Sequence, residues 1–200
     1  MSLREQKKLE TRRTISNVAT RLFIDRGFEQ VTIADVAEAA RVAKMTVTNH
    51  FGRKEDLVFD IRNDFVDWPT NLVSGAPSKP ALVAVRDGFL AELDERSALL
   101  GFAELPFVRM VRQSETLQSA LTEMHLDRER QLVAEILDRN PRQEMLSRAA
   151  GAHLTSVLRL LFEDVWDLTW ADVPEDDLVA RVRDSANLAF GQLEPALGKL

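Results

Sequence analysis

The residue types best suited to chemistry in this chain of 200 residues lie close together, in the segment KMTVTNHF at 44–51. If this segment is helical, Val47 and Phe51 lie four residues apart and face a core. Short polar groups and one methionine occupy the other positions, which are Lys44, Met45, Thr46, Thr48, Asn49 and His50. Such side chains can closely approach the base edges and phosphates of a duplex, so the segment is a candidate DNA-reading helix.

The chemistry of these side chains divides them between bases and phosphates. Asn49 can pair bidentately with an adenine, and Thr48 or Met45 can lie against the methyl group of a thymine. Phosphate contacts fix the register of a protein without reading sequence. We expect such contacts from Thr46, His50 and Lys54. The alternative is a surface helix of a helical bundle that binds nothing. Such a helix would show the same spacing of apolar and polar residues.

The sequence gives little support to enzymatic chemistry. It has no cysteine, no glycine-rich phosphate loop, no G-x-S-x-G and no H-E-x-x-H, and its three histidines lie far apart. We therefore expect no enzyme, no metal site and no cofactor. No apolar run approaches the roughly 18 residues of a membrane-spanning helix. We therefore expect no membrane partner. The absence of cysteine fits a reducing compartment, so we expect a cytoplasmic protein.

A DNA-reading helix needs a rigid brace, and the preceding residues predict one. A helix from about Leu3 to Arg26 should end at Gly27. Thr32 is followed three residues later by Asp35, which resembles a capping box and predicts the start of a second short helix. The inward faces of these two helices carry Ile15, Val18, Ala19, Leu22, Phe23, Ile33, Val36 and Ala37. Together with the candidate reading helix they predict a small three-helix head.

Periodicity predicts helices and no strands in the rest of the chain. A linker helix is expected at 55–66, and the proline, glycine and serine of WPTNLVSGAPSKP predict a loop up to Pro80. Further helices are expected at 81–96, 99–112, 116–138, 143–170 and 174–197. Pro106 should kink or split the second of these and free backbone carbonyls there, which makes it a candidate moving part.

The charge of the chain is divided unequally along the sequence. Residues 1–54 contain 11 Lys/Arg and 6 Asp/Glu, a net charge of +5, whereas residues 55–200 contain 15 and 26, a net charge of −11. A basic head can neutralise phosphates while an acidic body is kept away from the duplex. A merely uneven surface is the alternative.

Residues 9–62 resemble the DNA-binding domain of the TetR family of bacterial regulators. The resemblance follows the family order through LFIDRGFEQVTIADVAEAARVAKMTVTNHFGRKEDL. It includes the Gly-Phe after the first helix, the threonine that opens the second, the alanine-rich IADVAEAA, the T-V-T-N-H-F of the recognition helix and the K-E-D-L that follows. Carried over to this sequence, the usual DNA contacts of the family fall on Thr32, Lys44, Met45, Thr46, Thr48, Asn49, His50 and Lys54.

The resemblance implies an all-α fold with two parts. Residues 1–54 would form a three-helix helix-turn-helix domain with its motif at 32–51, followed by the linker helix, and residues 67–200 a larger helical domain for ligand binding and dimerisation. Arg41 stands where the family usually has glycine, and a left-handed backbone there costs about 1 kcal/mol. Arg41 therefore either accepts this strain while reaching a phosphate, or the turn differs. The family often has an aromatic residue in place of Thr48, so its base preference does not transfer.

For the larger domain, the resemblance implies that the last two long helices pair across a two-fold axis. Both helices carry many apolar positions, and the second has small residues that allow close contact. The predicted dimer interface consists of Leu154, Leu158, Leu161, Val165, Val182, Ala186, Ala189, Phe190 and Leu193. The alternative is that both helices are buried in the core of the monomer. A half-site reader of this size needs a partner to span two successive grooves, which favours the dimer.

The middle helices are expected to hold a small-molecule effector. Its apolar lining is predicted to be Phe89, Phe102, Phe107, Met110, Met124 and Phe162. Polar groups that can orient it are Arg109, His125, Arg128 and His153. Ordinary core packing is the alternative for each of these residues. The apolar majority favours an apolar or amphipathic effector.

The sequence therefore predicts a homodimeric, ligand-responsive repressor that binds a palindromic double-stranded DNA operator and is released by an effector. Three alternatives stay open. The chain could be a regulator controlled without a ligand. It could be an activator, because activation depends on operator position. It could also be a non-specific nucleoid-type binder, although such a protein should be basic throughout.

Overall fold

The computed structural model describes residues 2–198, without the side chains of residues 3 and 4, and this part of the chain is helical with no strand. The α-helices are α1 (Leu3–Arg26), α2 (Ile33–Ala39), α3 (Lys44–His50), α4 (Arg62–Ser74), α5 (Ala81–Asp94), α6 (Leu105–Gln113), α7 (Glu115–Arg139), α8 (Glu144–Trp170) and α9 (Glu175–Leu197). Two short 3-10 helices are η1 (Glu55–Leu57) and η2 (Ala98–Leu100). The predicted all-α class is confirmed.

Backbone contacts divide the chain into two compact units. The first, called the head here, runs to Arg62 and also includes Arg109–Ala120. The second, called the body, consists of Asn63–Val108 and the chain from Leu121 onward. The corner between α6 and α7 therefore packs with the head, although it lies far from it in sequence.

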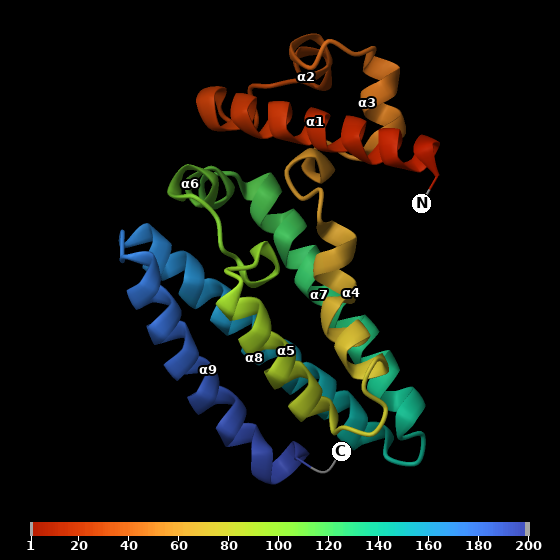
Figure 1. Cartoon of the computed structure of the whole chain (residues 1–200), viewed down its shortest axis with the longest axis vertical. Coiled ribbons are helices and arrows are strands. Elements are labelled where there is room, and N and C mark those ends of the chain that lie inside the picture. The colour runs from red at the N-terminus through yellow and green to blue at the C-terminus, as the bar shows by residue number, and fades with distance from the viewer. Residues whose placement is uncertain (1, 199–200) are drawn as a thin grey trace. The chain divides into compact units, whose positions relative to one another are not determined.

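In the head, α2 and α3 lie along the same side of α1 (Figure 1). Gly27 ends α1 with a φ of 88°, and its N–H donates to the Phe23 carbonyl at 2.9 Å. The Thr32 hydroxyl accepts from the Asp35 N–H at 3.2 Å, and the Asp35 carboxylate accepts from the Thr32 N–H at 2.7 Å, so the predicted capping box is present. The core of the head contains Ile15, Ala19, Phe23, Val36, Val47 and Phe51.

The predicted continuous linker helix at 55–66 is wrong. Helix η1 is a single short turn, and α4 begins only at Arg62. The carbonyl of Leu57 accepts from the Ser16 hydroxyl at 3.1 Å, and that of Asp60 accepts from Arg12 Nη2 at 3.5 Å. Side chains of α1 therefore bind these two carbonyls in the region between the start of η1 and α4.

The loop predicted from Trp68 to Pro80 is wrong in its first half, because α4 continues through Pro69 to Ser74. Proline has no N–H, so Pro69 leaves the Phe65 carbonyl without its helical donor. Nε of Arg128, from α7, donates to this carbonyl at 3.0 Å. A side chain distant in sequence therefore replaces the hydrogen bond that the proline removes.

In the body, α8 and α9 pack together as a pair, and α5 packs against α9 (Figure 1). Phe89 of α5 meets Phe190 of α9 edge to face, with ring centroids 5.8 Å apart. The segment around Pro106 is split as predicted, into η2 and α6. Pro106 lies in the first turn of α6, where the missing N–H leaves no carbonyl unpaired, so the prediction of freed carbonyls at this proline is wrong. None of the described helices is long and apolar enough to span a membrane.

Candidate functional site

Helix α3 presents an exposed face whose side chains are those predicted to read DNA. Lys44, Met45, Thr48 and Asn49 are exposed, and 69% of the surface of Met45 is accessible. Val47 is completely buried on the opposite side. The exposed apolar side chain of Met45 on this face suits contact with a thymine methyl group.

The hydroxyl of Thr48 is turned back onto its own helix. It donates to the Met45 carbonyl at 3.1 Å and lies 3.4 Å from the Lys44 carbonyl. The methyl group of Thr48 is therefore the part left for a base edge. Thr32 is likewise engaged, because its hydroxyl donates to the Asp35 carboxylate at 2.6 Å while it caps α2.

The turn before α3 adopts the strained conformation expected at Arg41. Its φ is 55°, in the left-handed region. The Arg41 N–H donates to the Glu38 carbonyl at 3.0 Å and the Val42 N–H to the Ala37 carbonyl at 3.0 Å, which ends α2 as a glycine would. The strained backbone of the first alternative is confirmed, and the phosphate contact of Arg41 stays a prediction. The Arg41 side chain is exposed next to α3.

Sequence reasoning missed Arg12, which fixes the C-terminal end of α3. Its Nη1 donates to the His50 carbonyl, and its guanidinium lies 4.2 Å from the centroid of the Phe51 ring. A cation at this end of a helix is favourable because the unpaired carbonyls there carry partial negative charge. Arg12 therefore positions the reading helix from α1. No local pattern marks it, since its partners lie 38 or more residues away.

His50 and Thr46 are half-buried, at the edge of the exposed face. Burial, followed by the nearby Lys8 and Arg12 charges, lowers the pKa of His50 below its ordinary value. The imidazole is therefore neutral at pH 7 in the chain without DNA.

Lys54, a predicted phosphate contact, is half-buried, and its ammonium is bound within the head. Its ammonium donates to the Phe28 carbonyl at 2.5 Å and lies 4.2 Å from the centroid of the Phe28 ring. Burial lowers its pKa, while Glu29 and Glu55 act in the opposite direction. Lys54 thus connects the segment after α3 to the turn after α1.

The predicted dimer interface is mostly interior to the monomer. Seven of its nine residues are buried in the single chain, namely Leu154, Leu158, Leu161, Val165, Val182, Ala186 and Phe190. Ala189 and Leu193 are half-buried. The alternative, burial within the monomer, is therefore correct for the seven. On the outer faces of the same helices, Leu160 is 55% exposed and Leu188 is 68% exposed.

The predicted effector residues fall into several environments. His125, Arg128 and Phe162 lie together in the body, where the His125 and Phe162 rings are 5.4 Å apart. Phe89 and Met124 are buried, Phe107 is half-buried, and His153 is exposed. Arg109 and Met110 belong to the segment that packs with the head.

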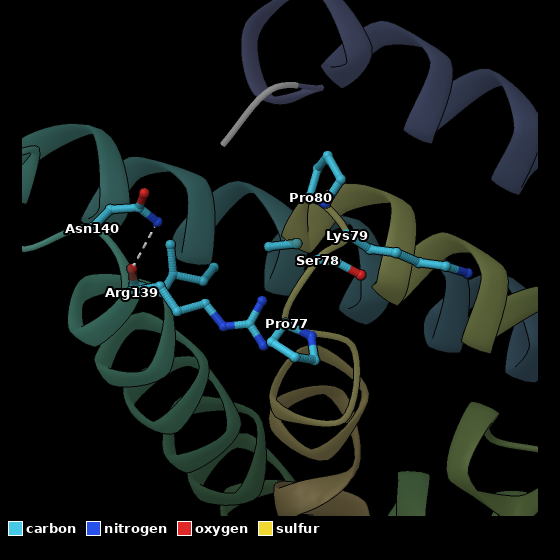
Figure 2. Close-up of a pocket in the computed structure, with 8 residues that line it drawn as sticks. Pro77, Ser78, Lys79, Pro80, Arg139 and Asn140 are labelled. Atoms are coloured by element: carbon cyan, nitrogen blue, oxygen red, sulfur yellow. Dashed lines mark hydrogen bonds between the residues drawn. The ribbon is translucent and has the colours of Figure 1, made fainter.

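Two pockets in the body have the size of ligand sites. One has a volume of about 450 Å³ and is lined by Arg96, Phe102, Ala103, Glu104, Leu105, Thr169, Asp172, Val173, Glu175 and Leu178. The other has about 390 Å³ and lies between the α4–α5 loop and the end of α7 (Figure 2). Its two cations are already paired, Arg139 with Glu135 and Lys79 with Asp87, each at 3.1 Å. Phe102 is the predicted effector residue that lines one of these pockets.

The geometry of the head defines a class of protein, since two short helices braced by a third, with one exposed reading face, form a helix-turn-helix DNA-binding domain. Residues 15–61 match the family model of the bacterial regulatory proteins of the tetR family. This match covers the head, and it is to the family that the sequence led us to expect for these residues.

Curated relatives match the same region. The HTH-type transcriptional repressor KstR2 of Mycolicibacterium smegmatis is 35% identical over 51 residues, which are 26% of this chain and 25% of that protein. KstR2 of Rhodococcus jostii is 32% identical over 80 residues, 37% of this chain and 39% of that protein. The chain thus spans between a quarter and two fifths of these relatives, which are transcriptional regulators and not enzymes.

Solved structures share the fold over nearly the whole chain. NalD of Pseudomonas aeruginosa, the secondary repressor of the MexAB-OprM multidrug efflux pump, has a TM-score of 0.56 at 17% identity and covers 97% of this chain and 98% of its own. The fatty acid degradation regulator FadR of Bacillus halodurans has a TM-score of 0.51 at 17% identity, with coverages of 92% and 96%.

Proposed function

We propose that this protein is a ligand-responsive transcriptional repressor that binds its operator as a homodimer. The observation that carries the proposal is the exposed face of α3, where Lys44, Met45, Thr48 and Asn49 are presented on a helix that Arg12 holds at its C-terminal end. The match of residues 15–61 to the tetR family supports it. Met45 and Asn49 then contact bases, and Lys44 and Arg41 contact phosphates.

The second copy of the chain pairs through the outer faces of α8 and α9. Leu160 and Leu188 are large apolar side chains left exposed on these faces. Gly191 lies one turn after Leu188, and a Cβ built there would meet nothing within 4 Å, so another helix can approach closely. Pairing by the same patch on both copies gives a two-fold axis and hence two half-sites on DNA.

An effector bound in the body lowers the affinity for DNA. The fold is shared over nearly the whole chain with NalD, a repressor of a multidrug efflux pump, and with FadR, a regulator of fatty acid degradation, which supports this part of the proposal. A tenfold to hundredfold change in affinity needs only about 1.4 to 2.7 kcal/mol of coupling.

The corner between α6 and α7 connects the effector to the head. The Ser114 hydroxyl donates to the Glu29 carboxylate at 2.7 Å and caps α7 by accepting from the Leu117 N–H at 3.2 Å. Helix α7 then continues into the body. A movement of α7 therefore acts directly on the contact between Ser114 and Glu29, which lies in the turn after α1.

Selection from a pool of randomised duplexes by the full chain tests the function. The proposal expects enrichment of an inverted repeat with half-sites about one helical turn apart. Uniform recovery of all sequences, with affinity set by salt alone, would contradict it and indicate a non-specific binder.

A further inference from the structure

One arginine in the body is buried without a counter-ion. Arg128 of α7 is 1% exposed. Its Nε donates to the Phe65 carbonyl at 3.0 Å, its Nη2 lies 3.5 Å from the Leu99 carbonyl, and its guanidinium lies 3.5 Å from the centroid of the Phe65 ring. Among the residues that the structure describes, no carboxylate lies within ion-pair distance of Arg128, and the two acceptors of its guanidinium are both backbone carbonyls.

The absence of a carboxylate at Arg128 is conspicuous because the surrounding part of the chain is acidic. Residues 55–200 carry 26 Asp/Glu and 15 Lys/Arg. Burial lowers the pKa of Arg128 to about 9, so the group is still charged at neutral pH. A buried charge without a partner is disfavoured, and removing the charge would relieve this penalty. A guanidinium kept in this state is suited to receive an anion from outside the chain.

The side chains around Arg128 include several aromatic rings. His125 lies one turn earlier on α7, with its ring 5.2 Å from that of Phe65 and 5.4 Å from that of Phe162. Phe162 in turn lies 4.9 Å from Trp166. Nδ1 of His125 is buried with no hydrogen-bond partner, and burial, followed by the charges of Arg128 and Arg159, lowers the pKa of this ring to about 3. The histidine is therefore neutral and adds no negative charge.

We propose that Arg128, His125, Phe65, Phe162 and Trp166 form the effector site, and that the effector is a carboxylate on an apolar skeleton. The carboxylate binds the guanidinium of Arg128, whose planar donors match its two oxygens, and the skeleton lies against the aromatic rings. A single guanidinium neutralises a carboxylate but only part of the charge of a phosphate. This inference rests on the proposed control by a ligand and gives its chemical class.

The pocket lined by Phe102 adjoins the turn that packs on these rings. Phe102 directly follows Gly101, whose carbonyl accepts from Trp166 Nε1 at 2.9 Å. Gly101 has a φ of 99°, and a Cβ built there would lie 3.0 Å from the Phe162 ring. The turn that borders the pocket is thus in direct contact with the aromatic rings, so a ligand entering the pocket reaches them when this turn shifts.

The same guanidinium holds two parts of the body in place. Arg128 takes the carbonyl that Pro69 leaves free in α4 and approaches the carbonyl of Leu99 in η2. A carboxylate that draws the guanidinium toward itself competes with these carbonyls. Binding therefore acts on α4 and on the segment leading to α6.

Titration of the full chain with matched acids and alcohols tests the site. Tryptophan fluorescence reports on it, because Trp166 contacts Phe162 and the Trp68 ring lies 6.0 Å from the Arg128 guanidinium. The probes are decanoate, decanol and decyl phosphate, with 2-naphthoate and 2-naphthalenemethanol as a second skeleton. We expect at least one acid to bind ten or more times more tightly than its alcohol, and decyl phosphate to bind more weakly than decanoate.

The variant Arg128→Gln should abolish the preference for the acid. Arg139→Gln is the matched control, because Arg139 is also on α7 and also donates to a carbonyl of α4, that of Val73, but is paired with Glu135. It should keep the preference. If Arg128→Gln does not fold, the same change is made together with Pro69→Ala, which gives the Phe65 carbonyl its own helical donor.

A preference for the acid that survives in Arg128→Gln would overturn the proposal, as would equal binding of acid and alcohol for both skeletons. Tighter binding of decyl phosphate would overturn the assignment of a carboxylate. Release of the selected duplex by alcohols but not by acids would contradict this effector site and still support a ligand-responsive repressor. Acid binding that depends on Arg128, in a chain that selects no duplex, would support this site and contradict the proposed repressor function.

Discussion

Arg41 combines a strained backbone with an exposed side chain beside the reading helix. Its φ of 55° favours glycine, so Arg41→Gly should raise the free energy of unfolding of the head by about 1 kcal/mol. The same change should weaken operator binding, because it removes a cation next to the phosphates. Asp172→Gly is the control, since Asp172 has the same φ of 55° in the body. Chemical denaturation and DNA titration measure the two effects, and operator binding unchanged in Arg41→Gly would exclude a phosphate contact.

His125 makes the stability of the body depend on acidity. Its pKa is about 3 in the folded chain against an ordinary value of 6.5, so the unfolded chain binds the proton first. Stability is therefore unaffected above pH 6.5 and is lost as the pH falls from 6.5 toward 3, by about 2 kcal/mol at pH 5. His125→Gln should flatten this part of the profile relative to the unchanged chain. His153→Gln, at an exposed position, should leave the pH profile of stability unchanged. If stability falls equally with pH in His125→Gln and in the unchanged chain, His125 is not the group responsible.

At the scale of the element, α4 depends on a partner from α7. Arg128→Gln should destabilise the body by about 1 to 3 kcal/mol, because it leaves the Phe65 carbonyl buried without a donor. In a Pro69→Ala background the loss should be smaller, since the new N–H takes that carbonyl. A double-mutant cycle measures the coupling. Additive effects of the two changes would show that the arginine does not replace the missing helical bond.

Helix limits were predictable wherever the signal was local. Gly27 and the Thr32–Asp35 capping box end α1 and start α2 as the sequence indicated. The linker was not predictable, because its contacts are distant in sequence: Ser16, which binds the Leu57 carbonyl, lies 41 residues before it. Continuation of α4 through Pro69 likewise depends on a contact 63 residues away.

In the candidate site, too, only the features set by local sequence spacing were predictable. Periodicity separated Val47 from the exposed residues of α3, but it could not show that Lys54 turns toward the Phe28 carbonyl or that Arg12 holds the end of the helix. Nor could it tell which apolar face of α8 and α9 the monomer covers itself. Leu160 and Leu188 stand out only when the packing is known.

At the scale of the whole molecule, the outer faces of α8 and α9 should determine both dimerisation and DNA binding. Leu188→Glu should convert a dimer to a monomer and lower operator affinity by more than tenfold, because one half-site is lost. Leu126→Glu, at a position 48% exposed on α7, is the control and should do neither. Analytical ultracentrifugation and operator titration measure the outcome. A Leu188→Glu chain that stays dimeric would place the interface elsewhere.

The central claim is that α3 reads base sequence from its exposed face. Titration of Asn49→Ala and Lys44→Ala against the selected operator and its single-base variants tests this claim most directly. Asn49→Ala should lose about 1 to 3 kcal/mol and relax specificity at one base position. Lys44→Ala should weaken all sequences alike and lower the salt slope by about one unit. Identical behaviour of the two variants, with no base position affected, would contradict the account.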